Sequence, residues 1–325
     1  MRNTFSVVAA FNETIVTRAP TRIDFGGGWT DVPPYSDEMG GFVCNVAITR
    51  YATVTLSPDA TDVSRTSAAD RAIIDAAARR FGIPSSRINA RSDFPVSAGL
   101  GGSSATGVAA VAALAAARGE AMTQTTMAEL SRDIEIADVG IAGGRQDHYA
   151  AAYGGALGLR FSADGVEVTR IPLSLEFIEA LERRCTIVFT GQSRISGDTI
   201  NAVIGAYQQR DASVMRCLDR MRVVAESMAD ALAAHDLDSL AELTREQWKH
   251  QRALHPAITT PLIDEIIERA NAAGAAGAKA LGASGGGCVL VIARADSAES
   301  VRAAVTPLGE VLPFRLAPCG VERCG

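Results

Sequence analysis

Lysine is almost absent from this chain of 325 residues: only Lys249 and Lys279 occur, and every other basic side chain besides histidine is arginine. The N-terminal half can therefore offer a phosphate only arginine, which excludes the loops that place a lysine before a serine or threonine. The formal net charge is -6, and no run of basic residues is present. Surfaces for nucleic acid or anionic membranes need clustered positive charge, so we expect neither partner.

Metal-type cysteine spacing and long apolar runs are also missing. The six cysteines form no C-x-x-C pair, and no histidine stands at zinc-ligand spacing, so we expect reduced thiols. The apolar run at residues 5–11 is too short for a signal peptide with its cleavage site. No stretch reaches the roughly 20 apolar residues of a membrane-spanning helix. We expect a cytoplasmic protein, and a homodimer is compatible with the chain.

Aromatic residues are scarce, at 5%, so the core must be built mainly from Ala, Val, Ile and Leu. The length suits one large domain or two ordinary ones. A strand-rich half gives way to a helix-rich half near residues 175–185, which predicts one domain over 1–180 and a second over 181–325. Hydrophobic periodicity predicts helices over 68–81, 105–117, 124–138, 197–234, 236–253 and 261–273, and strands within 13–56, 88–94, 156–171, 185–190 and 288–293.

The segment 95–106 has the order strand, Gly/Ser loop, helix. The first turn of a helix has unpaired N–H groups and partial positive charge, and glycines let a backbone approach an anion closely. Ser103 and Ser104 could cap the helix, bind a phosphate oxygen or ligate Mg²⁺. The alternative is a plain serine-capped helix. The spacing does not fit the dinucleotide fingerprint G-x-G-x-x-G.

Two acidic residues follow this loop in the chain and are candidates for the same site. Glu135 lies on a predicted helix between two isoleucines, and Asp147 follows a glycine-rich loop. A carboxylate pair could hold Mg²⁺ and orient a hydroxyl nucleophile. The alternative for Glu135 is a solvated helix face.

Two further glycine-rich segments are candidates for contact with a ligand. Arg22 and Asp31 bracket the glycines 26–28 and offer a cationic fork and a hydroxyl acceptor, with a surface ion pair as the alternative. The run 282–287 precedes a buried strand and indicates close backbone approach, either to a phosphate or to another strand.

The ordered set of these segments resembles the GHMP kinases. It comprises A-P-x-R ending at Arg22, P-x-x-x-G-L-G-G-S-S-A from Pro95, the glycine-rich approach to Asp147, and G-x-S-G-G-G from Gly282. Within that class the chain looks most like the bacterial D-glycero-D-manno-heptose 7-phosphate kinases, through the segments 26–31, 34–36, 144–147, 153–155, 190–194 and 258–264. Two positions depart from that pattern: His148 stands where Gln is usual, and Gln251 where Lys is frequent.

The resemblance implies an α+β, two-domain GHMP kinase fold with the active site in the cleft between the domains. Its N-terminal part is a mixed-sheet α/β domain with a left-handed crossover, and its C-terminal domain is ferredoxin-like. It implies an enzyme, a phosphotransferase with an alcohol acceptor, that uses ATP and Mg²⁺. The implied acceptor is the anomeric hydroxyl of a heptose 7-phosphate.

The resemblance also implies residue roles. Asp147 accepts the proton of the acceptor hydroxyl or orients it, Arg22 steadies the phosphoryl group, and Ser104 with Glu135 holds Mg²⁺. The loop residues that would surround the ATP phosphates are Pro95, Ser97, Ala98, Gly99, Leu100, Gly101, Gly102, Ser103 and Ser104. The residues expected at the sugar are Gly28, Thr30, Asp31, Gly144, Arg145, Arg194, Gly285 and Gly286, with Arg145 or Arg194 as the partner of a distal phosphate.

Three alternatives remain at this point. The acceptor could be another sugar, such as L-fucose. A non-catalytic ligand sensor with the same fold is disfavoured because every residue of the implied catalytic and metal set is present. An isoprenoid-pathway kinase would need a more apolar acceptor pocket than the polar segments 30–31 and 190–194 indicate.

Overall fold

The computed structural model describes residues 11–60, 66–141, 143–192 and 197–324. The strands are β1 (Ile15–Gly26), β2 (Gly41–Leu56), β3 (Ile88–Ser92), β4 (Ala156–Ser162), β5 (Gly165–Ile171), β6 (Cys185–Phe189), β7 (Ala275–Ala280), β8 (Cys288–Ala293), β9 (Glu310–Leu312) and β10 (Glu322–Cys324). The helices are α1 (Tyr35–Met39), α2 (Ala68–Phe81), α3 (Gly102–Ala117), α4 (Gln124–Asp133), α5 (Gln146–Tyr153), α6 (Leu175–Arg184), α7 (Gly197–Gln208), α8 (Ala212–Ala233), α9 (Leu237–Ala253), α10 (Pro261–Ala272) and α11 (Ala298–Val305).

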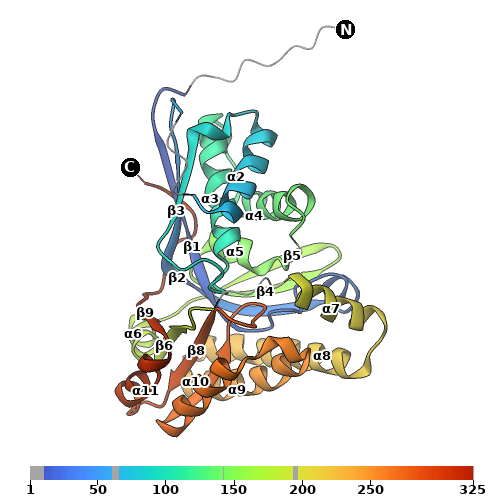
Figure 1. Ribbon diagram of the computed structural model, residues 1–325, viewed down its shortest axis with the longest axis vertical. Coiled ribbons are helices and arrows are strands. Elements are labelled where there is room, and N and C mark those ends of the chain that lie inside the picture. The colour runs from blue at the N-terminus through green and yellow to red at the C-terminus, as the bar shows by residue number, and fades with distance from the viewer. Residues whose placement is uncertain (1–10, 61–65, 142, 193–196, 325) are drawn as a thin grey trace.

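The first sheet has the strand order β10-β1-β2-β4-β5, and β3 also pairs with β2. Side chains alternate between its two faces, so Val43 belongs to the hydrophobic cluster beneath the helices while Cys44 belongs to the cluster shared with the second sheet. Helices α2 to α5 cover the first of these faces (Figure 1). Helix α3 is rich in alanine, is buried on nearly all sides and packs against β1, and the Arg22 N–H of β1 donates to the Leu100 carbonyl just before the helix.

The second sheet has the order β7-β8-β6-β9 and lies in the lower half of Figure 1 with α9, α10 and α11. The elements of this domain follow one another in the ferredoxin-like order: a strand, helices, a β-hairpin, a helix and a last strand. One hydrophobic cluster runs from Ile23 and Phe25 of β1 through Met228 of α8 to Ile187 and Leu290 of the second sheet. The two sheets therefore share a continuous core.

The predicted two-domain α+β fold is confirmed, with one correction. Every pairing among the described strands is antiparallel, so the first sheet is antiparallel rather than mixed. The division at residue 180 stays a prediction: α6 spans it, and β10 returns to pair with β1. The left-handed crossover also stays a prediction.

Several helix boundaries differ from those expected. The helix predicted over 124–138 is α4 followed by a π-helical turn at Ile134–Asp138. The helical stretch predicted over 197–234 divides into α7 and α8, because Arg210 adopts a φ of 60° and Asp211 caps a new start. Helices α1, α5, α6 and α11 were not predicted, since segments of 5 to 10 residues are shorter than the window of about 11–18 residues over which a helical period is recognised.

The cap of α8 provides a test of this boundary. The Asp211 carboxylate accepts hydrogen bonds from the backbone N–H groups of Ser213 and Val214. We expect Asp211→Ala to lower the free energy of unfolding by about 1 kcal/mol in urea denaturation, because two N–H groups lose their acceptor. The neighbouring control, Ser213→Ala, removes an exposed hydroxyl and should change stability by less than about 0.5 kcal/mol. Equal effects of the two changes would contradict the capping role.

Candidate active site

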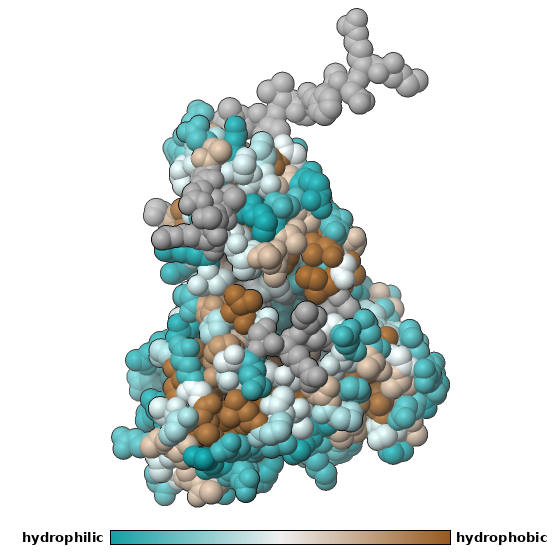
Figure 2. Space-filling model, viewed as in Figure 1, coloured by the Kyte–Doolittle hydropathy of each residue, from teal (hydrophilic) through white to brown (hydrophobic). Residues whose placement is uncertain are grey.

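A cleft of about 810 Å³ is lined by segments from both sheets. The described lining includes the ends of β1 and β3, the loop 94–104, Glu135, the start of α7, residues 143, 144, 146 and 147, and residues 281–284, 286 and 287. Figure 2 shows the molecule hollowed between its upper and lower parts, with hydrophobic residues beside the hollow. Val96 and Ile141 are exposed hydrophobic residues of this lining.

The loop 97–101 brings the start of α3 against β1 and Asp147. Gly101 is the N-cap of α3 with a φ of 77°, so neither Ser103 nor Ser104 caps the helix and the serine-cap alternative is wrong. A Cβ on Gly101 would lie 2.9 Å from the carboxyl carbon of Asp147. The free N–H groups of this 16-residue helix therefore open beside a carboxylate, in a geometry that suits a phosphate next to a reacting hydroxyl.

Arg22 of β1 is the buried cation of the site. Its Nε and Nη2 donate to Asp147 Oδ1 over 2.8 and 2.7 Å, and its Nη1 donates to the carbonyl of Gly99 over 2.6 Å. The fork therefore fixes the loop and the carboxylate relative to each other. The alternative reading, a surface ion pair between Arg22 and Asp31, is wrong, since both side chains are buried and Arg22 binds Asp147 instead.

The Asp147 carboxylate stands in the first turn of α5 and is partly accessible from the cleft. Burial raises its pKa above the ordinary value for aspartate, against the opposing effect of the Arg22 charge. A carboxylate whose affinity for a proton is raised, and which points into a cleft, is suited to accept a proton from a hydroxyl group.

Glu135 belongs to a buried polar cluster rather than to a solvated helix face. Its Oε2 lies 2.9 Å from His148 Nε2 and accepts from Ser104 Oγ over 3.4 Å, while His148 Nδ1 lies 3.0 Å from Ser131 Oγ. Burial by itself would raise the pKa of Glu135, but hydrogen bonds from His148, Ser103 and Ser104, together with the His148 charge, hold it below its usual range. The carboxylate is thus kept in the charged form that a cation needs.

Asp31 is a second buried carboxylate in the lining. Its Oδ2 accepts from the backbone N–H of Gln146 over 3.0 Å. A Cβ on Gly144 would overlap this carboxylate, so the glycine is what allows the two segments to meet. Burial raises the pKa of Asp31 to about 6, with smaller contributions from the charges of Asp147 and Asp24.

An ion pair between the two sheets was missed by sequence reasoning. Lys279 of β7 donates to the Asp24 carboxylate over 3.0 Å and to the Asp24 carbonyl over 2.9 Å, and both side chains are buried. Burial lowers the pKa of Lys279, against the effect of the Asp24 charge. One signal was available in the sequence, because one of its few lysines lies within an apolar strand. A lysine buried in such a strand needs an anionic partner.

Most of the predicted site residues line the cleft, including every residue predicted in the loop Pro95–Ser104. Three described ones do not line it: Thr30 is buried and bonds the carbonyls of Gly27 and Phe42, Gly285 donates to the Ile258 carbonyl, and Arg145 turns to the Ser162 carbonyl and Asp37. Arg194 lies outside the described residues. Of the two arginines predicted to meet a distal phosphate, the described one faces away from the cleft.

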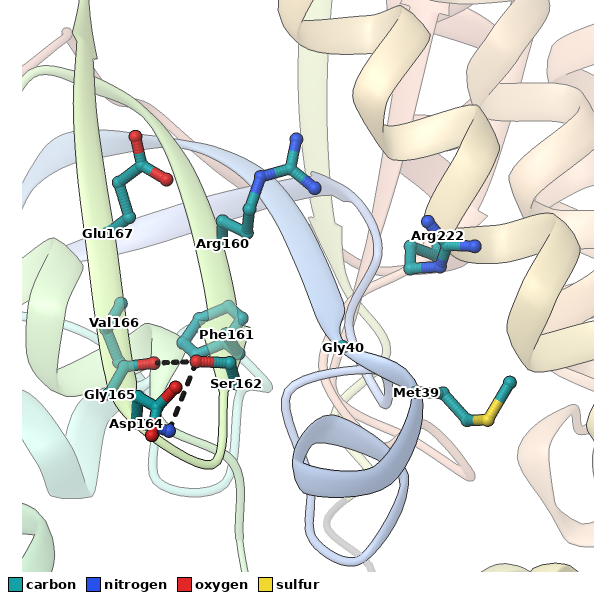
Figure 3. Close-up of a pocket in the computed structure, with 10 residues that line it drawn as sticks. All are labelled: Met39, Gly40, Arg160, Phe161, Ser162, Asp164, Gly165, Val166, Glu167 and Arg222. Carbon is teal, nitrogen blue, oxygen red and sulfur yellow. Dashed lines mark hydrogen bonds between the residues drawn. The ribbon is translucent and has the colours of Figure 1, made fainter.

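A second hollow of about 410 Å³ lies between the β4–β5 hairpin, the end of α1 and α8 (Figure 3). Arg160 and Arg222 lie at this hollow, and both pair with Glu226 at 2.9 and 3.5 Å. None of the predicted site residues that the structure describes lines it. The cleft between the sheets is therefore the candidate active site.

The comparisons agree with this geometry. The model of the GHMP kinases N terminal domain matches residues 68–155, and that of the GHMP kinases C terminal domain matches residues 228–309, together just over half of the chain. No helix among the described residues has the length and apolar character to cross a membrane.

Two relatives match most of the chain. A bifunctional fucokinase/GDP-fucose pyrophosphorylase from Arabidopsis thaliana is 28% identical over 87% of this chain, which spans 30% of that protein. The D-glycero-alpha-D-manno-heptose 7-phosphate kinase of Campylobacter jejuni is 27% identical over 85% of this chain and 88% of its own length.

Solved structures share the fold at low identity. A D-glycero-D-manno-heptose 1-phosphate kinase from Bacteroides thetaiotaomicron superposes with a TM-score of 0.76 at 24% identity, covering 96% of this chain and 99% of its own. The L. major mevalonate kinase in complex with R-mevalonate gives 0.73 at 16% identity, covering 97% and 98%. With both family domains matched and the fold shared end to end, the chain belongs to the GHMP kinases, phosphotransferases with an alcohol group as acceptor.

Proposed function

We propose that this protein transfers the γ-phosphate of ATP to the anomeric hydroxyl of a sugar, with a heptose 7-phosphate as the first candidate acceptor. The observation that carries the chemistry is the Asp147 carboxylate, held by Arg22 beside the N-terminus of α3. The C. jejuni relative, a heptose 7-phosphate kinase covered over 88% of its length, supports the choice of acceptor.

The transfer follows from the positions of the chain's own groups. The loop and the first turn of α3 bind the β- and γ-phosphates through backbone N–H groups. The acceptor hydroxyl gives its proton to Asp147, and its oxygen attacks the γ-phosphorus. A new O–P bond forms while the bond to the bridging oxygen breaks and ADP leaves. An anomeric hydroxyl is more acidic than an ordinary alcohol, so a carboxylate suffices as base.

The donor set near the loop fits Mg²⁺. Among the described residues no group of three or more His, Cys, Asp or Glu side chains could bind a metal. Mg²⁺ in kinases takes one or two protein oxygens and completes its shell with phosphates and water. Ser104 Oγ and the charged Glu135 carboxylate, which both line the cleft, are such oxygens. When bound, the ion would neutralise charge on the transferring phosphate.

L-fucose is the second candidate acceptor, and two observations favour it. The Arabidopsis relative carries a fucokinase name and is 28% identical. Arg145, a predicted partner for a distal phosphate, bonds the Ser162 carbonyl and does not line the cleft. A sugar without a second phosphate would need no such partner.

We expect the purified protein with Mg·ATP to release ADP in the presence of one of these two sugars, and ³¹P NMR to find a new anomeric phosphate. Turnover only with heptose 7-phosphate supports the first acceptor. Turnover only with L-fucose keeps the kinase and replaces the acceptor. ADP release that neither sugar accelerates would contradict the proposed sugar kinase.

The role of Asp147 predicts a rate effect and a pH effect. Asp147→Asn should lower kcat by about 10²–10⁴-fold, the usual contribution of a general base. In the parent enzyme, kcat should fall as pH drops through the raised pKa of Asp147, because the protonated carboxyl cannot accept a proton. Asp164→Asn, an exposed change in the β4–β5 turn, is the matched control and should leave kcat unchanged. A loss of only a few-fold in a folded Asp147→Asn protein would mean that the residue only positions the hydroxyl.

A further inference from the structure

Gln251 of α9 is a buried polar residue that does not line the cleft, with 1% of its surface exposed. Its side chain nevertheless reaches the residues 281–287, which join β7 to β8 and most of which line the cleft. These seven residues are called the connecting segment below. Any effect of Gln251 on the site would be exerted through this segment.

The amide nitrogen of Gln251 faces three acceptors at the start of the connecting segment. It donates to the carbonyls of Ala280 and Gly282 over 3.3 and 3.2 Å, and to Ser284 Oγ over 3.0 Å. Ser284 Oγ in turn donates to the Gly282 carbonyl over 3.4 Å. Carbonyl oxygens can only accept, so an NH₂ group suits this place and a carboxylate does not. One side chain of α9 thus bonds the first half of the segment.

The backbone of Ser284 needs such a hold. Its φ is 68°, in the left-handed region that residues with a Cβ rarely adopt. A conformation of this kind persists only where the surrounding structure fixes it. The hydrogen bond from Gln251 fixes the Ser284 side chain from a neighbouring helix.

The connecting segment packs backbone to backbone against the loop 97–101. A Cβ on Gly99 would lie 2.6 Å from the Leu281 carbonyl oxygen, so no side chain separates the two. Directly after the segment, the Cys288 N–H donates to the Ala98 carbonyl over 2.8 Å. Because the two backbones touch, a displacement of one displaces the other.

The loop 97–101 is bonded on to the charged groups of the site. Arg22 Nη1 donates to the Gly99 carbonyl over 2.6 Å, and the Arg22 N–H donates to the Leu100 carbonyl over 3.1 Å. The same arginine binds Asp147. The place of the connecting segment therefore helps to determine where the start of α3 stands relative to that carboxylate.

We propose that Gln251 is a positioning residue of the active site. It fixes the connecting segment, and the segment fixes the loop 97–101 where the ATP phosphates bind. This inference rests on the proposed function, which assigns that loop to the phosphates. Without the Gln251 amide the segment loses its bonds to α9, and the loop binds a nucleotide less tightly. Contiguous packed groups transmit such effects with modest coupling energies.

Nucleotide binding can be measured without any acceptor sugar. Isothermal titration of the full chain with Mg²⁺ and β,γ-imido-ATP, a non-hydrolysable analogue, gives the nucleotide Kd. Gln251→Leu keeps the approximate size of the side chain but removes the amide. We expect it to raise this Kd about 3–30-fold, the range that couplings through packed contacts span.

Gln247→Leu is the matched control, because it makes the same change one turn earlier on α9. Gln247 is fully buried, has no hydrogen-bond partner among the described residues and does not line the cleft. The nucleotide Kd of this control should stay within about twofold of the parent value.

Gln251→Glu provides a second variant of the same shape. It turns an acceptor toward the two carbonyls, so it should weaken nucleotide binding at least as much as Gln251→Leu. A role in packing alone would leave Gln251→Glu like the parent, because the size of the side chain is unchanged. Circular dichroism shows whether each variant is folded, and either folded Gln251 variant suffices for the test.

Hydrogen exchange measured by mass spectrometry tests the connecting segment without nucleotide. The N–H groups of Gly285, Gly287 and Cys288 are hydrogen-bonded to backbone carbonyls outside the segment. Peptides that cover residues 281–288 should exchange faster in the Gln251 variants than in the parent and in Gln247→Leu, because a loosened segment opens more often.

The outcomes separate this role from the proposed reaction. Weaker nucleotide binding together with faster exchange in a folded Gln251 variant, with Gln247→Leu like the parent, supports the role. A change in only one of the two measurements overturns it, as do an equal change in Gln247→Leu, no change at all, or two Gln251 variants that do not fold. A parent that binds no nucleotide overturns both the role and the proposed kinase. Binding that depends on Gln251, in a protein that phosphorylates neither sugar, keeps the role and contradicts the proposed sugar kinase.

Discussion

The buried pair of Lys279 and Asp24 is the constraint on which the cleft depends. It joins β7 of the second sheet to β1 of the first, at the point where β1 enters the lining. Taking two charges out of water is expensive, and removing one partner would leave the other buried and uncompensated. The pair therefore fixes one arrangement of the two sheets, and the space between them keeps its shape because that arrangement is fixed.

The other charged groups of the site are also paired, and these pairs lie next to Asp24 along β1 and next to Asp147 in α5. Two residues before Asp24, Arg22 binds Asp147 and the Gly99 carbonyl, and one residue after Asp147, His148 binds Glu135. Each group thus positions the next over short distances. Such a linked set holds its members in place before substrate arrives, which is the main contribution of a protein to phosphoryl transfer.

Local sequence patterns predicted the glycine-serine loop 95–104 and the helix α3 that follows it, because each depends on neighbouring residues. They could not predict contacts across the chain, such as the pair of Asp24 and Lys279, which are 255 positions apart. The direction of Arg145 was also beyond them. Arg145 immediately precedes the short helix α5. The residue at which this helix begins determines which of the neighbouring side chains face the cleft. Segments this short carry too few residues for a periodic signal.

The last described strand has a consequence for synthesis. β10 lies at one edge of the first sheet and pairs Val16 with Cys324, while Arg18 binds Glu322. Proteins emerge from the ribosome N-terminus first. The first sheet therefore cannot be completed while the second is still being made, although all of its other strands are already available. The vectorial order of translation leaves the open edge of β1 exposed until more than 300 residues have been made.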